Sequence, residues 1–191
     1  MKEKSEKKRL GMIFFILLIM VGMSFSLFSG FSGNAEKAKY NDIKFTRFPD
    51  RWEAKISGKE AAFSFLPNDV ENIPVSGDFA SLLQSKPEVD VTYDVNSTYN
   101  QSIALAQYQM GLTLEAYNIY VRQGFTSNNT FKTQIIKCKD ATQNVPVVYF
   151  RYANATRINV NGSCVIAEAS SNSDFIRAKD RLLYGILGVV K

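Results

Sequence analysis

Arg157-Ile-Asn-Val-Asn-Gly-Ser-Cys-Val-Ile-Ala-Glu168 is the stretch that decides the fold class of this chain. It holds two strand-like runs, residues 157–160 and 164–168, on either side of the pair Asn161-Gly162. Asn-Gly suits a type I′ turn, which needs a positive φ at both central residues. The stretch therefore predicts a β-hairpin near the carboxyl end of the chain.

Strands and one long helix are predicted directly upstream of this hairpin. Residues 89–93, 133–137 and 145–152 have strand patterns, and Pro146 indicates a strand start or a sheet edge. A long helix is predicted between the first two of these strands, over residues 98–123.

Only a narrow stripe of this long helix is non-apolar. Its members recur at spacings of three and four residues, which places them on one helix face: Gln107, Gly111, Glu115, Asn118 and Arg122. Because most of the remaining surface is apolar, we expect the helix to be largely buried.

A shorter helix is predicted after the hairpin, over residues 175–187. Ser173 can cap its start, and Asp174 in the first turn suits the positive end of the helix dipole. Gly188 is a suitable C-cap.

The region upstream predicts a three-stranded antiparallel meander and a short helix. The strands are residues 43–48, 52–56 and 61–65, and the helix covers residues 77–85 with Asp78 near its start. Because strands and helices are interleaved, the sequence predicts an α+β fold. We expect one mixed or mainly antiparallel sheet, packed by one long and one shorter helix, behind an N-terminal transmembrane helix.

An uncharged apolar segment covers residues 10–31. Its length matches the roughly 20 residues that cross a membrane as a helix. Lys7-Lys8-Arg9 precede it, whereas the nearest basic residues beyond it are Lys37 and Lys39. The denser basic cluster should stay in the cytoplasm. We expect a single-pass anchor in the cell membrane, with a cytoplasmic N-terminus and the C-terminal domain outside.

This anchor divides the chain into a basic tail (1–9), the anchor (10–31), a linker (32–40) and an extracytoplasmic domain (41–191). Two other interpretations stay open. A cleaved signal peptide would use Gly33-Asn34-Ala35 as its small-residue site, with an unusually long apolar core. A filament-type leader would be cut near Gly11.

The net charge of +5 lies mainly in the tail. Residues 1–10 hold five basic and two acidic residues, a net +3, so the outer part is close to neutral. The anionic lipid of the inner leaflet is the expected partner of this tail. No basic stripe with interleaved aromatics indicates nucleic acid, and the sequence identifies no small-molecule ligand.

The outer region holds both cysteines of the chain, Cys138 and Cys164. An even pair in an oxidising compartment predicts a disulfide, although two buried free thiols are the alternative. Neither belongs to a Cys-x-x-Cys pair, so a redox or zinc role is not indicated.

Five glycosylation sequons lie on the predicted outer side. Their acceptor residues are Asn96, Asn100, Asn128, Asn154 and Asn161.

The chain has no histidine, which removes Ser-His-Asp and Cys-His mechanisms and histidine metal sites. We assign no catalytic, metal-ligating or cofactor-binding residue and expect no cofactor. Six acids could pair for glycoside-type acid/base chemistry, or they could be scattered structural groups: Asp90, Asp94, Asp140, Glu168, Asp174 and Asp180.

The last helix carries a polar stripe. Its members are Arg177, Asp180, Arg181 and Tyr184. The stripe predicts either a solvated face or a docking face for a partner.

Four stretches near the carboxyl end stand out: Cys138-Lys-Asp-Ala-Thr142, Pro146-Val-Val148, Asn161-Gly-Ser-Cys164-Val-Ile166 and Asp174-Phe-Ile-Arg-Ala-Lys-Asp-Arg-Leu-Leu-Tyr-Gly-Ile-Leu-Gly188. With Ile43-Lys-Phe45, Trp52 and Phe63-Ser-Phe65, this set resembles a group of uncharacterised archaeal membrane-anchored proteins. The resemblance implies an archaeal origin, which suits the sequons and the anchor. It implies no activity, so it assigns no functional residue.

The leading hypothesis is a membrane-anchored binding or scaffold subunit of a cell-envelope assembly, with another envelope protein as its partner. Such a module should have an exposed apolar patch or groove. A cell-surface carboxylate-based hydrolase is the alternative, and it requires two or more of the six acids to converge in one pocket. A pilin-like filament subunit is a third hypothesis, and it requires cleavage beside Gly11.

Overall fold

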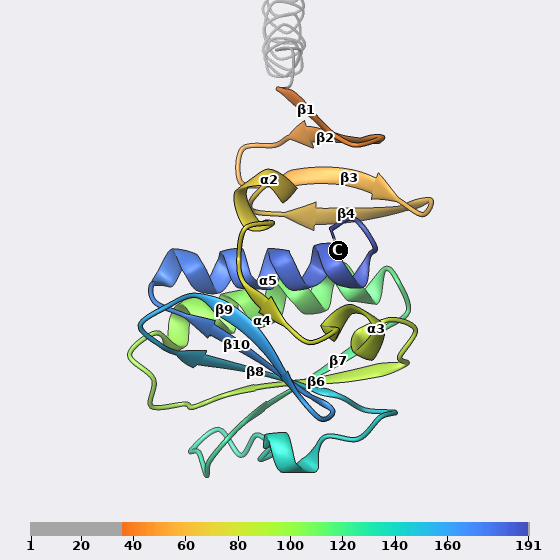
Figure 1. Cartoon of the computed structure of the whole chain (residues 1–191). Helices are drawn as coiled ribbons and strands as arrows, with labels where there is room; N and C mark the ends of the chain where they lie inside the picture. Colours follow the sequence, from red (N-terminus) through yellow and green to blue (C-terminus); the bar gives the residue numbers. More distant parts are fainter. Residues whose placement is uncertain (1–35, 191) are drawn as a thin grey trace, which may run out of the picture. The chain divides into compact units, whose positions relative to one another are not determined.

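The computed structural model describes residues 36–190, which form two β-sheets with a layer of helices between them. In Figure 1 the four-stranded sheet lies above the helix layer and the six-stranded sheet lies below it. The α+β class predicted from the sequence is confirmed. The single predicted sheet is wrong, because the N-terminal meander pairs only with itself and packs its apolar face on the helices.

The four-stranded sheet is an antiparallel meander in chain order. Its strands are β1 (Lys37–Tyr40), β2 (Ile43–Arg47), β3 (Trp52–Ile56) and β4 (Lys59–Phe63). The three predicted strands are confirmed, but residues 37–40, expected to be linker, add a fourth strand. Alternation buries Phe45, Ala54 and Phe63 on the face toward the helices.

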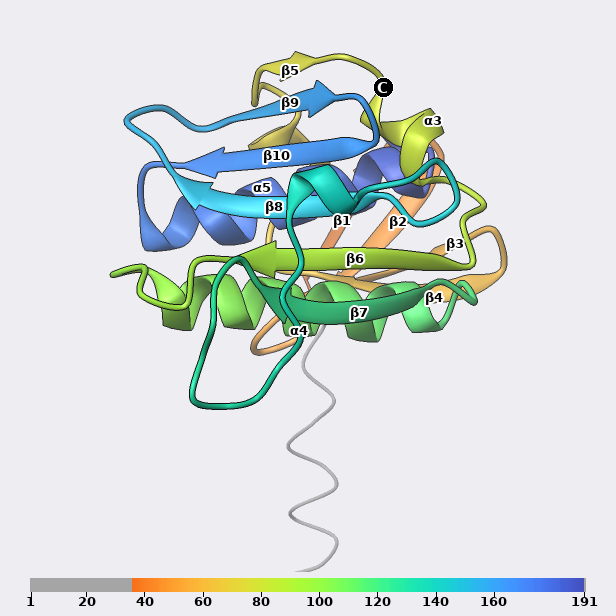
Figure 2. The same cartoon turned by 90° about the horizontal axis from the view of Figure 1, so that it is seen from below.

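The six-stranded sheet is mixed and has the order β5-β9-β10-β8-β6-β7 (Figure 2). Its strands are β5 (Val75–Ser76), β6 (Glu88–Tyr93), β7 (Tyr120–Phe125), β8 (Val147–Tyr152), β9 (Arg157–Asn161) and β10 (Cys164–Ala169). Strand β6 runs parallel to β7 and β8, and β8 runs parallel to β10. The predicted hairpin is confirmed as β9 and β10. Its turn differs from the predicted Asn161-Gly162 type I′ turn by one residue, because Asn161 ends β9 and pairs with Cys164, which leaves Gly162, at a φ of 58°, and Ser163 in the turn.

Four α-helices lie in the described region: α2 (Pro67–Val70), α3 (Phe79–Leu83), α4 (Asn100–Glu115) and α5 (Asn172–Ile186), with a 3-10 turn η1 at Cys138–Asp140. Two of them, α4 and α5, form the layer between the sheets (Figure 1). Within residues 36–190 no helix has the length and apolar character needed to cross a membrane. The predicted tail and anchor, residues 1–9 and 10–31, lie outside the described residues.

The long helix predicted over residues 98–123 is too long. Helix α4 ends at Glu115, Asn118 takes a φ of 59°, and β7 begins at Tyr120. The left-handed backbone at Asn118 ends the helix, because asparagine tolerates this conformation better than most residues. The predicted strand over residues 133–137 is reduced to a bridge between Phe125 and Ile135. Ser171, rather than Ser173, caps α5 by accepting from the Asp174 N–H.

Helix α5 joins the meander through aromatic packing. The Tyr184 ring stacks on Phe63 with centroids 4.1 Å apart and meets Phe45 edge to face at 6.2 Å. The Tyr184 hydroxyl donates to the Phe65 carbonyl at 2.7 Å. These contacts join α5 to the four-stranded sheet through the hydrophobic core, and all three rings are buried.

A buried carboxylate completes the junction. One oxygen of Asp180, Oδ2, accepts from the backbone N–H groups of Ser64 and Phe65 at 2.9 and 2.8 Å. The other, Oδ1, accepts from the Lys179 ammonium, and both side chains are almost fully buried. The segment between β4 and α2 is thereby held on α5.

The stripe predicted as a solvated or docking face of the last helix is therefore covered by the chain itself. Asp180, Arg181 and Tyr184 are buried, because the meander and its connection to α2 pack over them. Arg177 lies at the edge and donates to the Asp69 carbonyl at 2.5 Å. The polar groups of this face make hydrogen bonds within the domain, so the face is not exposed to a partner.

The predicted disulfide is present between Cys138 and Cys164. It joins η1 to β10 beside a small apolar cluster that includes Ile136 and Val147. The connection between β7 and β8 is thereby tied to the face of the six-stranded sheet that lies opposite the helices.

Replacing Asp180 with alanine should lower the free energy of unfolding by about 3–5 kcal/mol, because the Lys179 ammonium would stay buried without its partner. Urea unfolding measures this change. Asp42→Ala is the control, since this exposed carboxylate only pairs with Lys39 at the surface. A loss below about 1 kcal/mol for Asp180→Ala would match an ordinary surface change and contradict the expectation.

Reduction of the disulfide should lower the free energy of unfolding by about 3 kcal/mol, because it releases a loop with a sequence separation of 26 residues. Unfolding curves with and without reductant measure the effect. A Cys138→Ser/Cys164→Ser double variant should match the reduced protein and should not respond to reductant. Equal stability of the oxidised and reduced protein would contradict the expectation.

Candidate functional site

The outer surface of α4 exposes three large apolar side chains. Leu105 is 47%, Tyr108 57% and Leu112 54% exposed. The inner surface of the same helix is also apolar, with Ile103 and Met110 fully buried. Helix α4 is thus apolar on two opposite faces, and only one of them is covered by the domain.

The polar stripe predicted for this helix is divided between the two sides, since Glu115 and Asn118 are exposed but Gln107 is not. Gln107 is buried, and it lies on the inner side with Met110. Thr113 is also buried, and its hydroxyl donates to the Ala62 carbonyl of β4 at 3.2 Å. The prediction that α4 is largely buried is wrong for its outer face, because Leu105, Tyr108 and Leu112 are exposed there.

Five exposed residues run along the outer face of α4, and we call them the α4 seam: Gln101, Leu105, Tyr108, Leu112 and Glu115. Their spacings of four, three, four and three residues have the period of a coiled-coil seam. A stripe of this period stays in contact with one neighbouring helix when the two helices wind slightly around each other. The seam therefore has the geometry of a surface made for another helix.

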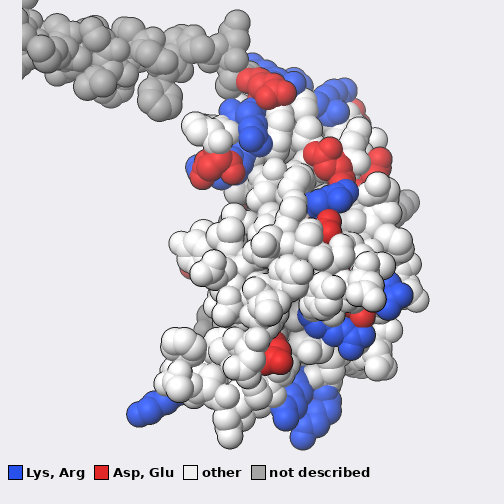
Figure 3. Space-filling model, turned by 90° about the vertical axis from the view of Figure 1, so that its left-hand side faces the viewer, with Lys and Arg blue, Asp and Glu red and all other residues white. Residues whose placement is uncertain are grey.

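Charged groups are scarce on this side of the domain. Glu115, the last residue of α4, is the single charged residue of the helix. In Figure 3 the left-hand margin at mid-height, on the side where α4 and β7 lie, is almost free of charged side chains. Burying the middle of the seam would therefore desolvate no charge, as is typical of the centre of protein interfaces.

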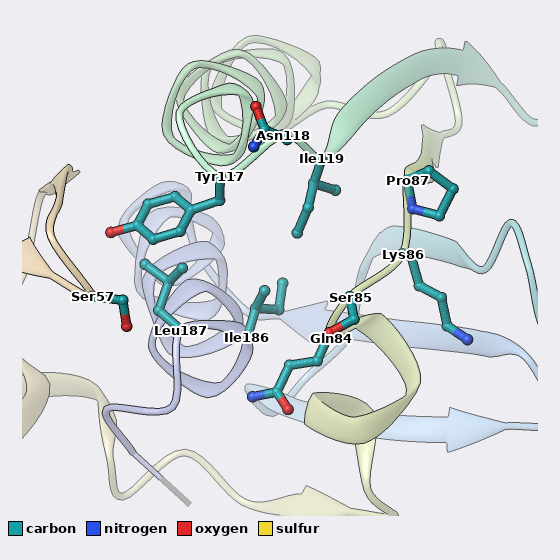
Figure 4. A pocket seen from close by; sticks show the side chains of 10 residues that line it. All are labelled: Ser57, Gln84, Ser85, Lys86, Pro87, Tyr117, Asn118, Ile119, Ile186 and Leu187. Carbon is teal, nitrogen blue, oxygen red and sulfur yellow. The ribbon is translucent and has the colours of Figure 1, made fainter.

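A separate pocket of about 530 Å³ lies where α4 and α5 end (Figure 4). Tyr117 and Ile119 point toward Ile186 and Leu187 from across this pocket. Its rim is polar and consists of Ser57, Gln84, Ser85, Lys86 and Asn118, with Pro87 beside them. The apolar interior and polar rim suit a small ligand, but no carboxylate lines the pocket.

Three residues on this rim have left-handed backbone conformations. Ser57, Ser85 and Asn118 take φ values of 50°, 56° and 59°. Ser57 lies in the turn between β3 and β4, and Ser85 and Asn118 follow the ends of α3 and α4, so local chain reversal explains the conformation.

Glu168 is the most heavily paired of the six acids considered from the sequence. Its carboxylate is 2% exposed and accepts from the Arg151 Nε at 2.9 Å, from the Arg157 Nε and from the Asn159 side chain. Burial raises the pKa of Glu168, but the hydrogen bonds and charges of Arg157 and Arg151 outweigh burial and hold this pKa below its ordinary value. Glu168 is therefore an ionised structural group on the outer face of the sheet.

The remaining acids also have structural partners. Asp90 accepts two hydrogen bonds of 2.7 Å from Arg122, and Asp174 accepts from Ser170 and Ser171 at the start of α5. Asp140 accepts from the Lys137 N–H, Asp94 accepts from the Asn96 N–H, and Asp180 holds the β4–α2 segment. None of the pockets described among residues 36–190 is lined by two of the six acids.

Metal-ligating side chains do not gather in the described part of the chain. Among residues 36–190 no group of three or more Cys, Asp or Glu side chains is placed to hold a metal ion.

All five sequon asparagines are exposed. Asn96 and Asn100 follow β6, Asn128 follows β7 and Asn154 follows β8. Because these three strands are parallel, their carboxyl ends share one edge of the sheet, and four of the five sequons lie along it. Asn161 lies apart, as the last residue of β9 beside the turn of the β9–β10 hairpin.

Comparison with known proteins finds no likeness that bears on function. No family model, no curated protein and no solved structure matches this chain.

Glu168→Gln should lower the free energy of unfolding by about 1–3 kcal/mol at neutral pH, because two guanidinium groups lose a charged acceptor. The lowered pKa means that the folded state releases this proton more readily than the unfolded chain. The stabilisation is therefore present above the unfolded-state pKa of about 4.3 and is lost as the pH falls through the lowered folded-state pKa.

The measurement is the difference in unfolding free energy between the native protein and Glu168→Gln, taken at several pH values from neutral to acidic. The difference should shrink toward acidic pH. Glu60→Gln, at an exposed position of β4, is the matched control and should give a small, flat difference. A difference that is independent of pH would show that the ion pairs do not stabilise the fold.

Proposed function

We propose that this chain is a single-pass, membrane-anchored binding or scaffold subunit of a cell-envelope assembly, and that its outer domain docks through the α4 seam. The observation that carries the proposal is the exposure of Leu105, Tyr108 and Leu112 on a helix whose other face already fills the core. A soluble surface helix normally has a polar outer face.

The size of this apolar surface supports a docking role. The three large side chains are about half exposed and together present roughly a few hundred Å² of apolar surface. The largest apolar patch of a typical monomeric protein has about this size and is often a functional surface. Its burial would be favourable at about 25 cal/mol per Å². The partial coiled-coil spacing further indicates that the partner contributes a helix.

An extracytoplasmic location is part of the proposal. The Cys138–Cys164 bridge suits an oxidising compartment. All five sequons are accessible in the folded domain. The resemblance to archaeal membrane-anchored proteins and the apolar segment over residues 10–31 agree with this location. Retention of the protein in the membrane fraction tests the anchor, and digestion of the domain by protease added to intact cells tests the side of the membrane.

The six acids give the hydrolase alternative no comparable support. They are distributed over separate ion pairs, turn contacts and a helix start, and none of the described pockets brings two of them together. A glycosidase needs two carboxyl groups that flank one scissile bond.

Substitution of Leu112 by glutamate should remove most of the cross-linked complexes that the full chain forms in its native membrane. We expect a loss of about tenfold or more, because a charge at the centre of an apolar contact must be desolvated. The complexes would be purified in mild detergent and sized by gel electrophoresis and mass spectrometry.

Phe48→Glu provides the matched control, since this phenylalanine is also exposed but lies outside α4. It should leave the complexes intact, and both variants should unfold at the same denaturant concentration as the native chain. Complexes that survive Leu112→Glu unchanged would refute docking through the seam.

A further inference from the structure

The structure points to an occupant for the α4 seam. We propose that a second copy of this chain packs its own seam there, with the two α4 helices antiparallel about a two-fold axis beside Tyr108. This inference rests on the proposed function, because it takes the seam as the docking surface. It adds the identity of the partner and the geometry of the contact.

The order of residues along the seam matches its own reverse. If Tyr108 faces Tyr108 of the copy, Gln101 lies opposite Glu115, because each is seven residues from Tyr108. Leu105, three residues before Tyr108, and Leu112, four residues after it, then lie next to each other with an axial offset of about 1.5 Å. The apolar residues then meet in the centre, and each end pairs an amide with a carboxylate. An amide N–H can donate to a carboxylate, so both ends of the contact are complementary.

A parallel arrangement lacks this complementarity. It would place Glu115 against Glu115 of the copy, which brings two like charges together at the border of an apolar contact. Like charges at helix contacts are unfavourable. Glu115, the single charged residue of the helix, therefore favours the antiparallel over the parallel orientation. A contact in which one patch meets itself is the isologous type found in two-fold dimers.

The neighbouring sequon leaves this contact open. Asn100 precedes Gln101 by one residue and therefore lies about 100° around the helix from it. A glycan on Asn100 would extend beside the seam rather than over it. The other three sequons of the same sheet edge lie in loops outside α4.

The extent of the seam predicts a reversible association. A helix of 16 residues is about 24 Å long. One helix pair of this length makes a smaller interface than the roughly 800 Å² per partner of standard stable complexes. Two chains anchored in one membrane meet at a raised effective concentration, which strengthens such a weak contact.

Single cysteines introduced into the seam test the contact directly. The native cysteines are joined to each other, so an introduced cysteine is the only free thiol of the described region. Tyr108→Cys in the full chain should form a disulfide-linked dimer when membranes are oxidised, because this residue lies beside the two-fold axis. Leu105→Cys and Leu112→Cys should cross-link efficiently only when the two variants are mixed.

Lys55→Cys is the control, since Lys55 is exposed on β3, away from α4. We expect about tenfold more dimer for Tyr108→Cys than for this control, because a disulfide forms only where the two Cα atoms can approach within about 7 Å. Efficient cross-linking of Leu105→Cys and of Leu112→Cys each with itself would establish a parallel pair and overturn the proposed geometry.

Charge substitutions at Gln101 give an independent test of orientation. Gln101→Lys would face Glu115 of the copy and should raise the dimer fraction, whereas Gln101→Glu should lower it, each by about two- to fivefold at low salt. In a parallel pair residue 101 faces itself, so both substitutions would weaken the dimer. Neither change removes the sequon at Asn100, because its middle position accepts any residue except proline.

Two differently tagged copies in one membrane separate this inference from the proposed function. Recovery of the second tag with the first, and its loss in Leu112→Glu, supports both. Complexes that depend on Leu112 but contain one tag only would overturn self-association while leaving the docking role. Complexes that do not depend on Leu112 would overturn both.

Discussion

The architecture depends on one buried carboxylate. Asp180 lies on α5 with no exposure to solvent, yet it accepts two backbone hydrogen bonds from the segment that leaves β4. These two N–H groups lie just beyond the end of β4, where they lack a sheet partner of their own. By satisfying them, Asp180 fixes the height and orientation of the four-stranded sheet over the helix layer. Tyr184, one turn further along α5, adds a hydrogen bond and two ring contacts to the same junction.

This junction determines which helix surface is left for function. The polar stripe of α5 is used to hold the meander, so it cannot serve as a docking face. Helix α4 carries no comparable stripe, and its few inward polar groups, Gln107 and Thr113, are buried on the core side. The apolar outer side of α4 is therefore left uncovered, and the proposed docking surface lies on this helix.

Charged groups in this domain serve structure more than chemistry. Glu168 neutralises two arginines on the outer face of the sheet, Asp90 holds Arg122, and Asp174 accepts hydrogen bonds at the start of α5. Each of these three carboxylates is paired with a nearby donor. A binding role fits this distribution better than acid/base catalysis, because binding through an apolar seam needs no perturbed acid.

Local features of the chain could be predicted because short-range interactions decide them. The β9–β10 hairpin, the Asp78 cap of α3 and the strands of the meander follow from turn chemistry, side-chain capping and period-two alternation. The pairing of Cys138 with Cys164 follows from their being the only two cysteines. The sequence by itself thus determined the hairpin, most strands, the disulfide and the α+β class. Only the tertiary structure decided that there are two sheets, that Asp180 and Tyr184 are buried, and that Leu105, Tyr108 and Leu112 are exposed. The periodicity of α4 is compatible with burial of either apolar face. The choice between them depends on which surface the six-stranded sheet and the meander cover, and residues far apart in the chain set that.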